Sequence, residues 1–346
     1  MKTAVVVCPG RGVYNKTELG YLARYHTDKR ALFDSFDAER RRLGQESLAA
    51  LDGAATYSVA KHTRGDNASG LIYAATLADF RSIDRTQVEV VAVTGNSMGW
   101  YSALACGGAL SAEAGFAVTN TMGALMQERL IGGQLIYPFV GEDWRPDLER
   151  KAQLLALTAE IGARPGHRLS LSIDLGGMLV LAGDEAGLTS FEAAVPPAQG
   201  RFPMRLSNHA AFHSPLQAPV AEAGRARTPA ALFGQPGLPL VDGRGAIWWP
   251  GASDPEALWD YTLGHQVTQT YDFTRAIRTA AREFAPDVFI VTGPGATLGG
   301  AIAQSLILAD WRGLGSKADF QNLQQTAPVL VSMGMEAQRA GVTARS

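Results

Sequence analysis

Residues 88–99 read Val-Glu-Val-Val-Ala-Val-Thr-Gly-Asn-Ser-Met-Gly, and they combine the signals of a strand, a sharp turn and a helix. The mostly apolar, β-branched run at 88–93 predicts a strand buried on both faces of a parallel sheet. The small and apolar residues at 97–105 predict a helix that begins at once. A sharp strand-to-helix turn with a glycine on either side lifts a serine side chain clear of the sheet. Ser97 is therefore predicted to be a nucleophile.

Similar strands are predicted near both ends of the chain. The apolar run at 3–8 ends in Pro-Gly-Arg-Gly, and the run at 285–292 ends in Gly-Pro-Gly, which opens a turn into a helix. A helix is predicted at 29–51, with charges on one face and leucines and phenylalanines on the other. Buried strands that alternate with helices predict an α/β-hydrolase-like domain with a parallel sheet.

The middle of the chain has a different pattern. Residues 132–206 predict a strand, a helix, two strands joined by a Gly-Gly turn, a second helix and a last strand. This is the ferredoxin-like order of an α+β domain. We therefore predict a large α/β domain made of residues 1–131 and 207–346. A smaller ferredoxin-like domain, residues 132–206, is inserted into it.

The composition narrows the class of protein. The 346 residues are 46% hydrophobic and 18% charged, which is typical of a globular chain. The net charge of −2 argues against a nucleic-acid binder, and the apolar run at the start of the chain is too short to span a membrane. The two cysteines, Cys8 and Cys106, exclude a disulfide scaffold, and no metal-ligand spacing is present. We expect a cytoplasmic protein without a metal, and a solvated helix face at Arg40-Arg41-Arg42.

A serine nucleophile needs a base, because its hydroxyl is weakly nucleophilic at neutral pH. The chain has six histidines. Two of them, His209 and His213, lie in the turn-like segment 208–216, which reads Asn-His-Ala-Ala-Phe-His-Ser-Pro-Leu. A lone histidine is more often structural than catalytic. The choice of His213 as the base therefore depends on the resemblance described next.

Four motifs, in order along the chain, resemble those of the malonyl-CoA:acyl carrier protein transacylases and the related acyltransferase domains of fatty acid and polyketide synthases. The resemblance extends from about residue 3 to about residue 305. The family's F-P-G-Q-G appears as Cys-Pro-Gly-Arg-Gly at 8–12, its G-H-S-x-G-E-Y-S-A-L as Gly-Asn-Ser-Met-Gly-Trp-Tyr-Ser-Ala-Leu at 95–104, its A-F-H-S-P unchanged at 211–215, and its late G-P-G at 293–295. A weaker match to G-Q-V-V-I-A-G lies at 177–183.

The resemblance implies an acyltransferase that works in two steps. Ser97 attacks the thioester of an acyl-CoA while His213 accepts its proton. The thiol of an acyl carrier protein's phosphopantetheine arm then attacks the acyl-serine ester, with His213 again as the base. The partners are thus acyl-CoA and an acyl carrier protein. No cofactor is expected on this chain, because the phosphopantetheine belongs to the partner protein.

The resemblance also implies supporting roles for three further residues. The oxyanion hole would be formed by the backbone N–H groups of Arg11 and Met98. In the family, a backbone carbonyl near a Q-x-x-N-P segment orients the histidine. That segment corresponds to Gln-Val-Thr-Gln-Thr at 266–270, and we assign the carbonyl to Gln269.

The departures from the family pattern concern the substrate pocket, to which we assign Asn96, Met122 and Arg11. In malonyl-specific members, an arginine in R-G-x-x-M-Q-E pairs with the free carboxylate of malonate, and here that position is Met122. A thioether cannot replace a bidentate pair, and a buried carboxylate without a partner is costly. The sequence therefore predicts an uncharged acyl group. Asn96, Trp100 and Arg11 replace a histidine, a glutamate and a glutamine of the family.

Arg11 leaves an alternative open. Its guanidinium could supply the missing cation from the other side of the pocket. Otherwise Arg11 contributes only its backbone N–H, and its side chain points to solvent or to a neighbouring carboxylate.

Two other functions also stay open. One is an acyl-thioester hydrolase, either an editing acyl-hydrolase or an esterase, that uses the same serine and histidine. The other is a non-catalytic subunit that binds acyl carrier protein, although the presence of both Ser97 and His213 argues against it. The last histidine, His265, lacks the setting of the late histidine of an esterase. We expect the carrier protein to dock across the cleft between the domains, near Arg201 and Arg205.

Overall fold

The computed structural model describes residues 1–344. Its central sheet has six strands in the order β11-β10-β1-β2-β7-β8, and every neighbouring pair is parallel except β7 with β8. The parallel sheet predicted from three apolar runs is therefore confirmed. The strands are β1 (Lys2–Cys8), β2 (Val88–Gly95), β7 (Leu240–Val241), β8 (Ile247–Trp248), β10 (Val288–Val291) and β11 (Leu330–Ser332).

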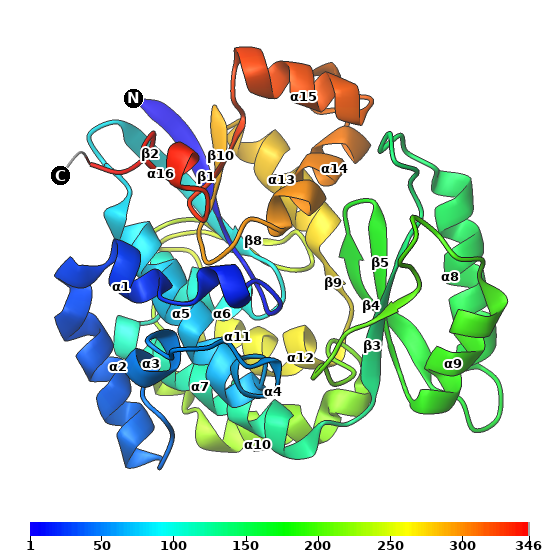
Figure 1. Ribbon diagram of the computed structural model, residues 1–346, viewed down its shortest axis with the longest axis horizontal. Coiled ribbons are helices and arrows are strands. Elements are labelled where there is room, and N and C mark those ends of the chain that lie inside the picture. The colour runs from blue at the N-terminus through cyan, green and yellow to red at the C-terminus, as the bar shows by residue number, and fades with distance from the viewer. Residues whose placement is uncertain (345–346) are drawn as a thin grey trace.

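Two groups of helices pack around this sheet (Figure 1). Helix α6 (Gly99–Cys106) packs on β1 and β2, with α5 (Gly65–Ser82) and α7 (Ala112–Arg129) against it. Helix α13 (Phe273–Phe284) packs on β2 and β7, and α14 (Leu298–Leu308) lies beside it. The last five residues of β1, Ala4 to Cys8, are completely buried, which explains why its sequence shows no polar alternation.

A second sheet of five strands has the order β6-β3-β5-β4-β9. Its first four strands and two helices follow one another as strand, helix, strand, strand, helix, strand, which is the predicted ferredoxin-like order. The elements are β3 (Gly133–Pro138), α8 (Leu148–Gly162), β4 (Leu169–Leu175), β5 (Met178–Gly183), α9 (Glu185–Ala194) and β6 (Met204–Arg205). Strand β9 (Tyr271–Asp272) comes from much later in the chain and pairs in parallel with β4.

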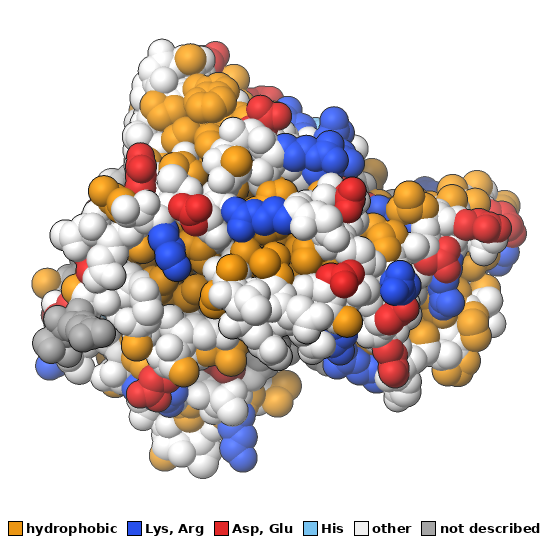
Figure 2. All heavy atoms as spheres, turned by 90° about the horizontal axis from the view of Figure 1, so that it is seen from above, with side chains coloured by type: hydrophobic (Ala, Val, Ile, Leu, Met, Phe, Trp, Pro, Cys, Tyr) orange, Lys and Arg blue, Asp and Glu red, His pale blue; other side chains and the backbone are white. Residues whose placement is uncertain are grey.

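The two sheets belong to two lobes of unequal size. The second sheet and its helices form the smaller lobe, at the right of Figure 1, and Figure 2 shows basic and acidic side chains interspersed over one face of both lobes. We propose to divide the chain into residues 1–131 with 207–346 and residues 132–206, with β9 as a strand that the larger part adds to the smaller lobe.

The structure departs from two expectations for the first hundred residues. The helix predicted at 29–51 is two helices, α2 (Arg30–Arg42) and α3 (Leu48–Asp52). Arg40 is not solvated but fully buried, and it donates hydrogen bonds to the Asn67 and Asn120 side chains and to two backbone carbonyls. Helix α5, which packs in the interior, was not predicted from the sequence.

The remaining elements are mostly short. Among residues 1–344, no helix combines the length and the apolar character that crossing a membrane requires. The other helices are α1 (Tyr21–Tyr25), α4 (Val59–His62), α10 (Ala218–Arg227), α11 (Pro255–Asp260), a π-helical turn (Tyr261–His265), α12 (Gln266–Thr268), α15 (Lys317–Thr326) and α16 (Glu336–Arg339), with short 3₁₀ turns at Lys16–Glu18, Thr27–Lys29, Pro215–Gln217, Ala230–Leu232 and Trp311–Gly313.

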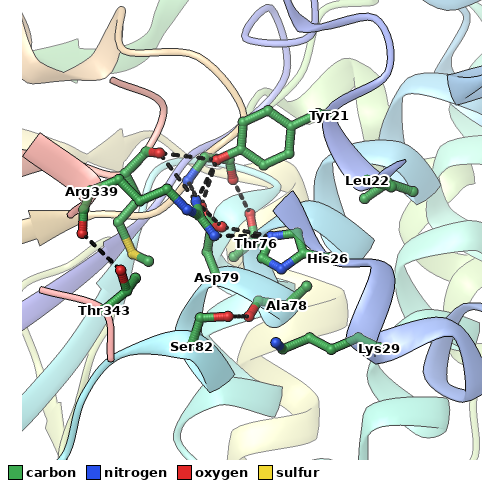
Figure 3. A network of polar contacts seen from close by, with 12 residues as sticks. Tyr21, Leu22, His26, Lys29, Thr76, Ala78, Asp79, Ser82, Arg339 and Thr343 are labelled. Atoms are coloured by element: carbon green, nitrogen blue, oxygen red, sulfur yellow. Dashed lines mark hydrogen bonds and ion pairs between the residues drawn. The ribbon is translucent and has the colours of Figure 1, made fainter. Parts of the chain in front are cut away.

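A buried polar network ties distant parts of the larger lobe together (Figure 3). The carboxylate of Asp79, on α5, accepts hydrogen bonds from the Tyr21 hydroxyl at 2.8 Å and the Gly293 N–H at 2.6 Å. It also contacts the His26 ring at 2.8 Å and the Arg339 guanidinium at 2.5 Å. Asp79 therefore connects α1, the turn after β10 and α16, all through one side chain without solvent exposure.

Candidate active site

Ser97 lies in the tight turn between β2 and α6, as predicted. Its backbone has a φ of 56°, in the left-handed region that non-glycine residues rarely adopt. The two flanking glycines are needed for space, because a Cβ at Gly95 would overlap the backbone of Gly99, and a Cβ at Gly99 would overlap the carbonyl of Cys8. The turn thus holds Ser97 in a strained conformation directly before the N-terminus of α6.

His213 lies next to Ser97. The Ser97 hydroxyl donates to His213 Nε2 over 2.7 Å, and His213 Nδ1 donates to the backbone carbonyl of Gln266 over 2.6 Å. The carbonyl can only accept, so it fixes the tautomer that leaves Nε2 free to accept a proton. Burial lowers the pKa of His213 to about 4, partly opposed by the hydrogen bond to Gln266. At neutral pH the ring is therefore an uncharged base.

The carbonyl that orients His213 belongs to Gln266, so the assignment to Gln269 is wrong. Gln269 follows the end of α12 in an extended conformation, three residues further along the chain. Gln266 also contacts the nucleophile turn, since its side-chain amide donates to the Ser97 carbonyl at 3.1 Å. The hydroxyl of Tyr101 donates to the other end of the same side chain at 3.1 Å. The sequence analysis therefore selected the right segment, 266–270, but missed the role of its first residue, Gln266.

The backbone N–H groups of Arg11 and Met98 lie in two neighbouring turns. β1 and β2 are parallel neighbours with Cys8 opposite Gly95, so both turns leave the same edge of the sheet. The Asn96 N–H donates to the Cys8 carbonyl at 2.9 Å and fixes the turns to each other. Within residues 1–344, neither the Arg11 N–H nor the Met98 N–H has a backbone acceptor. An oxyanion hole formed by these two groups remains a prediction.

A small cavity of about 20 Å³ adjoins Ser97 and His213. Most of its wall is apolar, and its lining residues come mainly from α7, α12, the turn at Ser97 and the segment around His213. Met122 is fully buried, and its sulfur lies against α10, where a Cβ added at Gly224 would be only 2.6 Å away. Asn96 does not line this cavity but a larger groove, and Trp100 is buried in the core with its indole N–H on Thr262.

Arg11 lines both the small cavity and a larger groove between the lobes, and the residue is partly exposed. Its Nη2 donates to the Thr63 carbonyl at 2.5 Å, and its guanidinium carbon lies 5.5 Å from the centre of the Phe212 ring. Its Nε is buried and has no hydrogen-bond partner in the described part of the chain. Burial lowers the pKa of Arg11 to about 10, partly opposed by Asp66, so Arg11 stays charged. Asp66 itself pairs with Arg64 at 3.0 Å.

A larger groove of about 470 Å³ runs between the two lobes and also reaches Ser97. Its lining includes apolar residues of the second sheet, together with Leu298 of α14. Arg205 lies along it but is already paired with Glu185 and Glu192, at 3.0 and 2.9 Å. Arg201 is exposed and does not line the groove.

His209, the second histidine of the segment, also lines this groove but has a different role from His213. Its Nδ1 bonds the Gln134 side chain at 2.9 Å. Burial, and secondarily the charge of Arg11, hold the pKa of His209 well below its ordinary range. The structure therefore brings Ser97, His213 and Arg11 together around one cavity and leaves His209 in a structural contact.

Comparisons with known proteins identify one relative in sequence and several proteins of similar fold. No family model matches the chain. The sequence is 27% identical over 321 residues to a phenolphthiocerol synthesis type I polyketide synthase of Mycobacterium marinum. The match covers 89% of this chain but 14% of that protein, so the chain spans only a small part of its curated relative.

Three solved structures have a similar fold. The malonyl-CoA:acyl carrier protein transacylase of Xanthomonas oryzae has a TM-score of 0.75 at 20% identity, covering 99% of this chain and 97% of that one. The acyltransferase domain of the second module of the salinomycin polyketide synthase has 0.72 at 20% identity, covering 96% and 69%. A malonyl-transacylase solved with a type II polyketide synthase acyl carrier protein has 0.68 at 22% identity, covering 89% and 99%. The chain therefore has the fold of the malonyl-CoA:acyl carrier protein transacylases, which it also resembles in its sequence motifs.

Proposed function

We propose that this chain transfers an acyl group from an acyl-CoA to the phosphopantetheine thiol of an acyl carrier protein, through an ester on Ser97, in the cytoplasm. The observation that carries the proposal is the hydrogen bond of 2.7 Å between Ser97 and a neutral His213, whose other nitrogen is held by a backbone carbonyl. A serine in contact with an oriented, uncharged base is the arrangement that nucleophilic catalysis requires.

In the first step, Ser97 Oγ attacks the thioester carbonyl carbon while its proton moves to His213 Nε2. The negative charge that develops on the carbonyl oxygen is met by the N–H groups of Arg11 and Met98. The C–S bond then breaks, and the leaving thiolate takes the proton from His213. The products are CoA and the acyl-serine ester.

The second step reverses the proton path. The carrier protein's thiol gives its proton to His213 and attacks the ester carbonyl, and the Ser97 oxygen leaves and recovers that proton. Because the histidine is held by the Gln266 carbonyl and not by a carboxylate, it carries no adjacent negative charge in either step. Over the two steps the His213 ring exchanges one proton with each thiol, and Ser97 returns to its starting state.

Two features support a carrier protein as the acceptor. The groove between the lobes reaches Ser97, as a narrow thiol-bearing arm requires. One protein of similar fold was solved in complex with its acyl carrier protein. Hydrolysis would use the same acyl-serine, with water in place of the thiol, so the fate of the acyl group distinguishes the two reactions.

The proposal is tested by intact-mass spectrometry after mixing the protein with acetyl-, malonyl- and octanoyl-CoA. We expect the mass of one acyl group on the wild type and none on Ser97→Ala. Adding carrier protein that bears phosphopantetheine should move the acyl group onto it, whereas carrier protein without phosphopantetheine should leave it in place. An adduct that persists on Ser97→Ala would refute the nucleophile. Release as free acid, at the same rate with and without the carrier protein, would identify a hydrolase.

A further inference from the structure

The carbonyl that orients His213 follows an unusual turn of the chain. Residues Tyr261–His265 form a π-helical turn between α11 and α12, in which the Gln266 N–H donates to the Tyr261 carbonyl, five residues back in the chain. An α-helical turn would use the carbonyl four residues back, and each residue of an α-helix rotates the chain by about 100°. The direction of the Gln266 carbonyl therefore depends on this turn keeping its π-helical form.

Two neighbouring aromatic residues of α6 contact this turn and the residue after it. The indole N–H of Trp100 donates to the Thr262 hydroxyl at 3.0 Å, and the Trp100 ring meets the Tyr261 ring edge-on, with 5.5 Å between the ring centres. The next residue, Tyr101, donates to the Gln266 side chain at 3.1 Å. Because α6 also begins directly after the nucleophile turn, one helix connects the nucleophile to the segment that orients its base.

The contact between Trp100 and Thr262 lies outside the space that a substrate could enter. Trp100 lines neither the small cavity nor the groove, and both residues are completely buried. Water therefore cannot replace the hydrogen bond if one partner is removed. Trp100 stands where the related transacylases have a glutamate, and an ionised glutamate has no proton to donate. The indole donor is thus a feature of this chain and not of the family's motif.

We propose that Trp100 is a positioning residue for the base. Its hydrogen bond to Thr262 keeps the π-helical turn in the form that directs the Gln266 carbonyl at His213 Nδ1, and so keeps the proton on Nδ1 and leaves Nε2 free to accept from Ser97. Trp100 acts through Gln266 and His213 and does not touch the acyl group. The effect on the reaction rate rests on the proposed acyl transfer, whereas the effect on the His213 ring does not.

The first test measures single-turnover acylation at a series of acyl-CoA concentrations. Thr262→Val, which exchanges the hydroxyl for a methyl group of similar size, and Trp100→Phe, which removes the donor, should each lower the maximal rate constant roughly 10-fold, as expected for one lost buried hydrogen bond. The acyl-CoA concentration that gives half the maximal rate should stay the same, because Trp100 lines neither the cavity nor the groove. Thr262→Ser, which keeps the hydroxyl, should restore the wild-type rate.

Two further variants exclude a general loss of stability as the cause. The double variant Trp100→Phe with Thr262→Val should be no slower than the slower single variant, because both changes remove the same contact. The matched control is Tyr137→Phe, which removes a buried donor to the Pro196 carbonyl in the smaller lobe and should leave the rate unchanged. Wild-type rates in Thr262→Val, or a loss that appears only in the half-saturating concentration, would overturn the proposal. If Trp100→Phe does not fold, the comparison of Thr262→Val with Thr262→Ser still decides.

A second measurement separates this inference from the proposed function. Nitrogen-15 NMR of histidine-labelled protein without acyl-CoA reports which ring nitrogen carries the proton, and His213→Ala assigns the signal. Wild type and Thr262→Ser should show His213 with its proton on Nδ1 alone, whereas Thr262→Val should show a mixture of the two tautomers. A single Nδ1–H tautomer in folded Thr262→Val would overturn the role of Trp100 even if Ser97 is acylated. A mixture in that variant would support the role even if no acyl-serine forms, and the proposed function would then fail alone.

Discussion

The pH dependence of acylation provides the sharpest test of the catalytic pair. Burial lowers the pKa of His213 to about 4 from its ordinary 6.5, so the neutral form, which acts as the base, persists into acid. At pH 5.5, a histidine with a pKa of 4 is about 97% neutral, whereas one with a pKa of 6.5 is about 9% neutral. The rate constant of acylation should therefore be nearly the same at pH 5.5 and pH 8 and should fall only as the pH passes through about 4.

The assay is single-turnover acylation of Ser97, quenched at short times and read by intact mass. The protein is held at pH 7.5 and moved to each test pH only at mixing, because prolonged exposure to low pH would also destabilise the folded protein. Between pH 6.5 and 4 the unfolded chain binds a proton at His213 that the folded chain does not. The free energy of unfolding therefore falls with decreasing pH in that window, by up to about 3 kcal/mol.

The control is His209→Asn, which removes the neighbouring half-buried histidine and should leave the profile unchanged. A midpoint near pH 6.5 in wild type would refute the reasoning, because it would mean that His213 is solvated during catalysis. A midpoint that shifts in His209→Asn would show that the wrong histidine had been assigned.

Three further predictions follow from contacts already described. His213→Ala should slow acylation by roughly 10²–10⁴-fold, and His209→Ala far less, when single-turnover rates are compared at pH 7.5. Asp79→Asn leaves the buried Arg339 without its counter-charge and should lower the free energy of unfolding by about 3–5 kcal/mol in urea titrations, whereas the exposed Glu160→Gln should change it far less. If Arg205 helps the carrier protein to dock, Arg205→Glu should slow transfer to the carrier protein at low salt and have little effect at high salt. Arg205 already pairs with two glutamates, so the wild type and Arg205→Glu could instead transfer at equal rates at every salt concentration. That result would exclude Arg205 from docking.

Local patterns in the sequence were enough to predict most of the fold. The two-sided burial of β1 and β2 appears directly as unbroken apolar runs, and the order of elements in 132–206 identified the ferredoxin-like lobe. Helix α5 was missed because it is buried almost all round, so its sequence lacks the polar face by which an amphipathic helix is recognised. Arg40 was misjudged because its partners, two asparagines, lie 27 and 80 residues away.

The sequence predicted the site residues that belong to recognisable motifs, but not the contacts that depend on how a carbonyl or a side chain is oriented. Ser97 and His213 lie in motifs that resemble those of the family in sequence and order, and the structure places the two side chains within hydrogen-bond distance. The choice between Gln266 and Gln269 depended on where a short helix ends, which propensity does not fix to within one turn. The Arg11 side chain donates a hydrogen bond to the carbonyl of Thr63, 52 residues away in the chain. The residue types alone could not predict its direction, because they do not show which distant carbonyl lies beside it.

Strand β9 has a consequence for how the two lobes can move. It pairs with β4 in the smaller lobe, while its Tyr271 hydroxyl donates to the Gly95 carbonyl at 2.6 Å and its ring lies 5.3 Å from that of His213. A hinge that opened the lobes would have to break this pairing or pull Tyr271 away from the nucleophile turn. Any opening of the groove would therefore be coupled to a change at the nucleophile turn, through the carbonyl of the glycine two positions before Ser97.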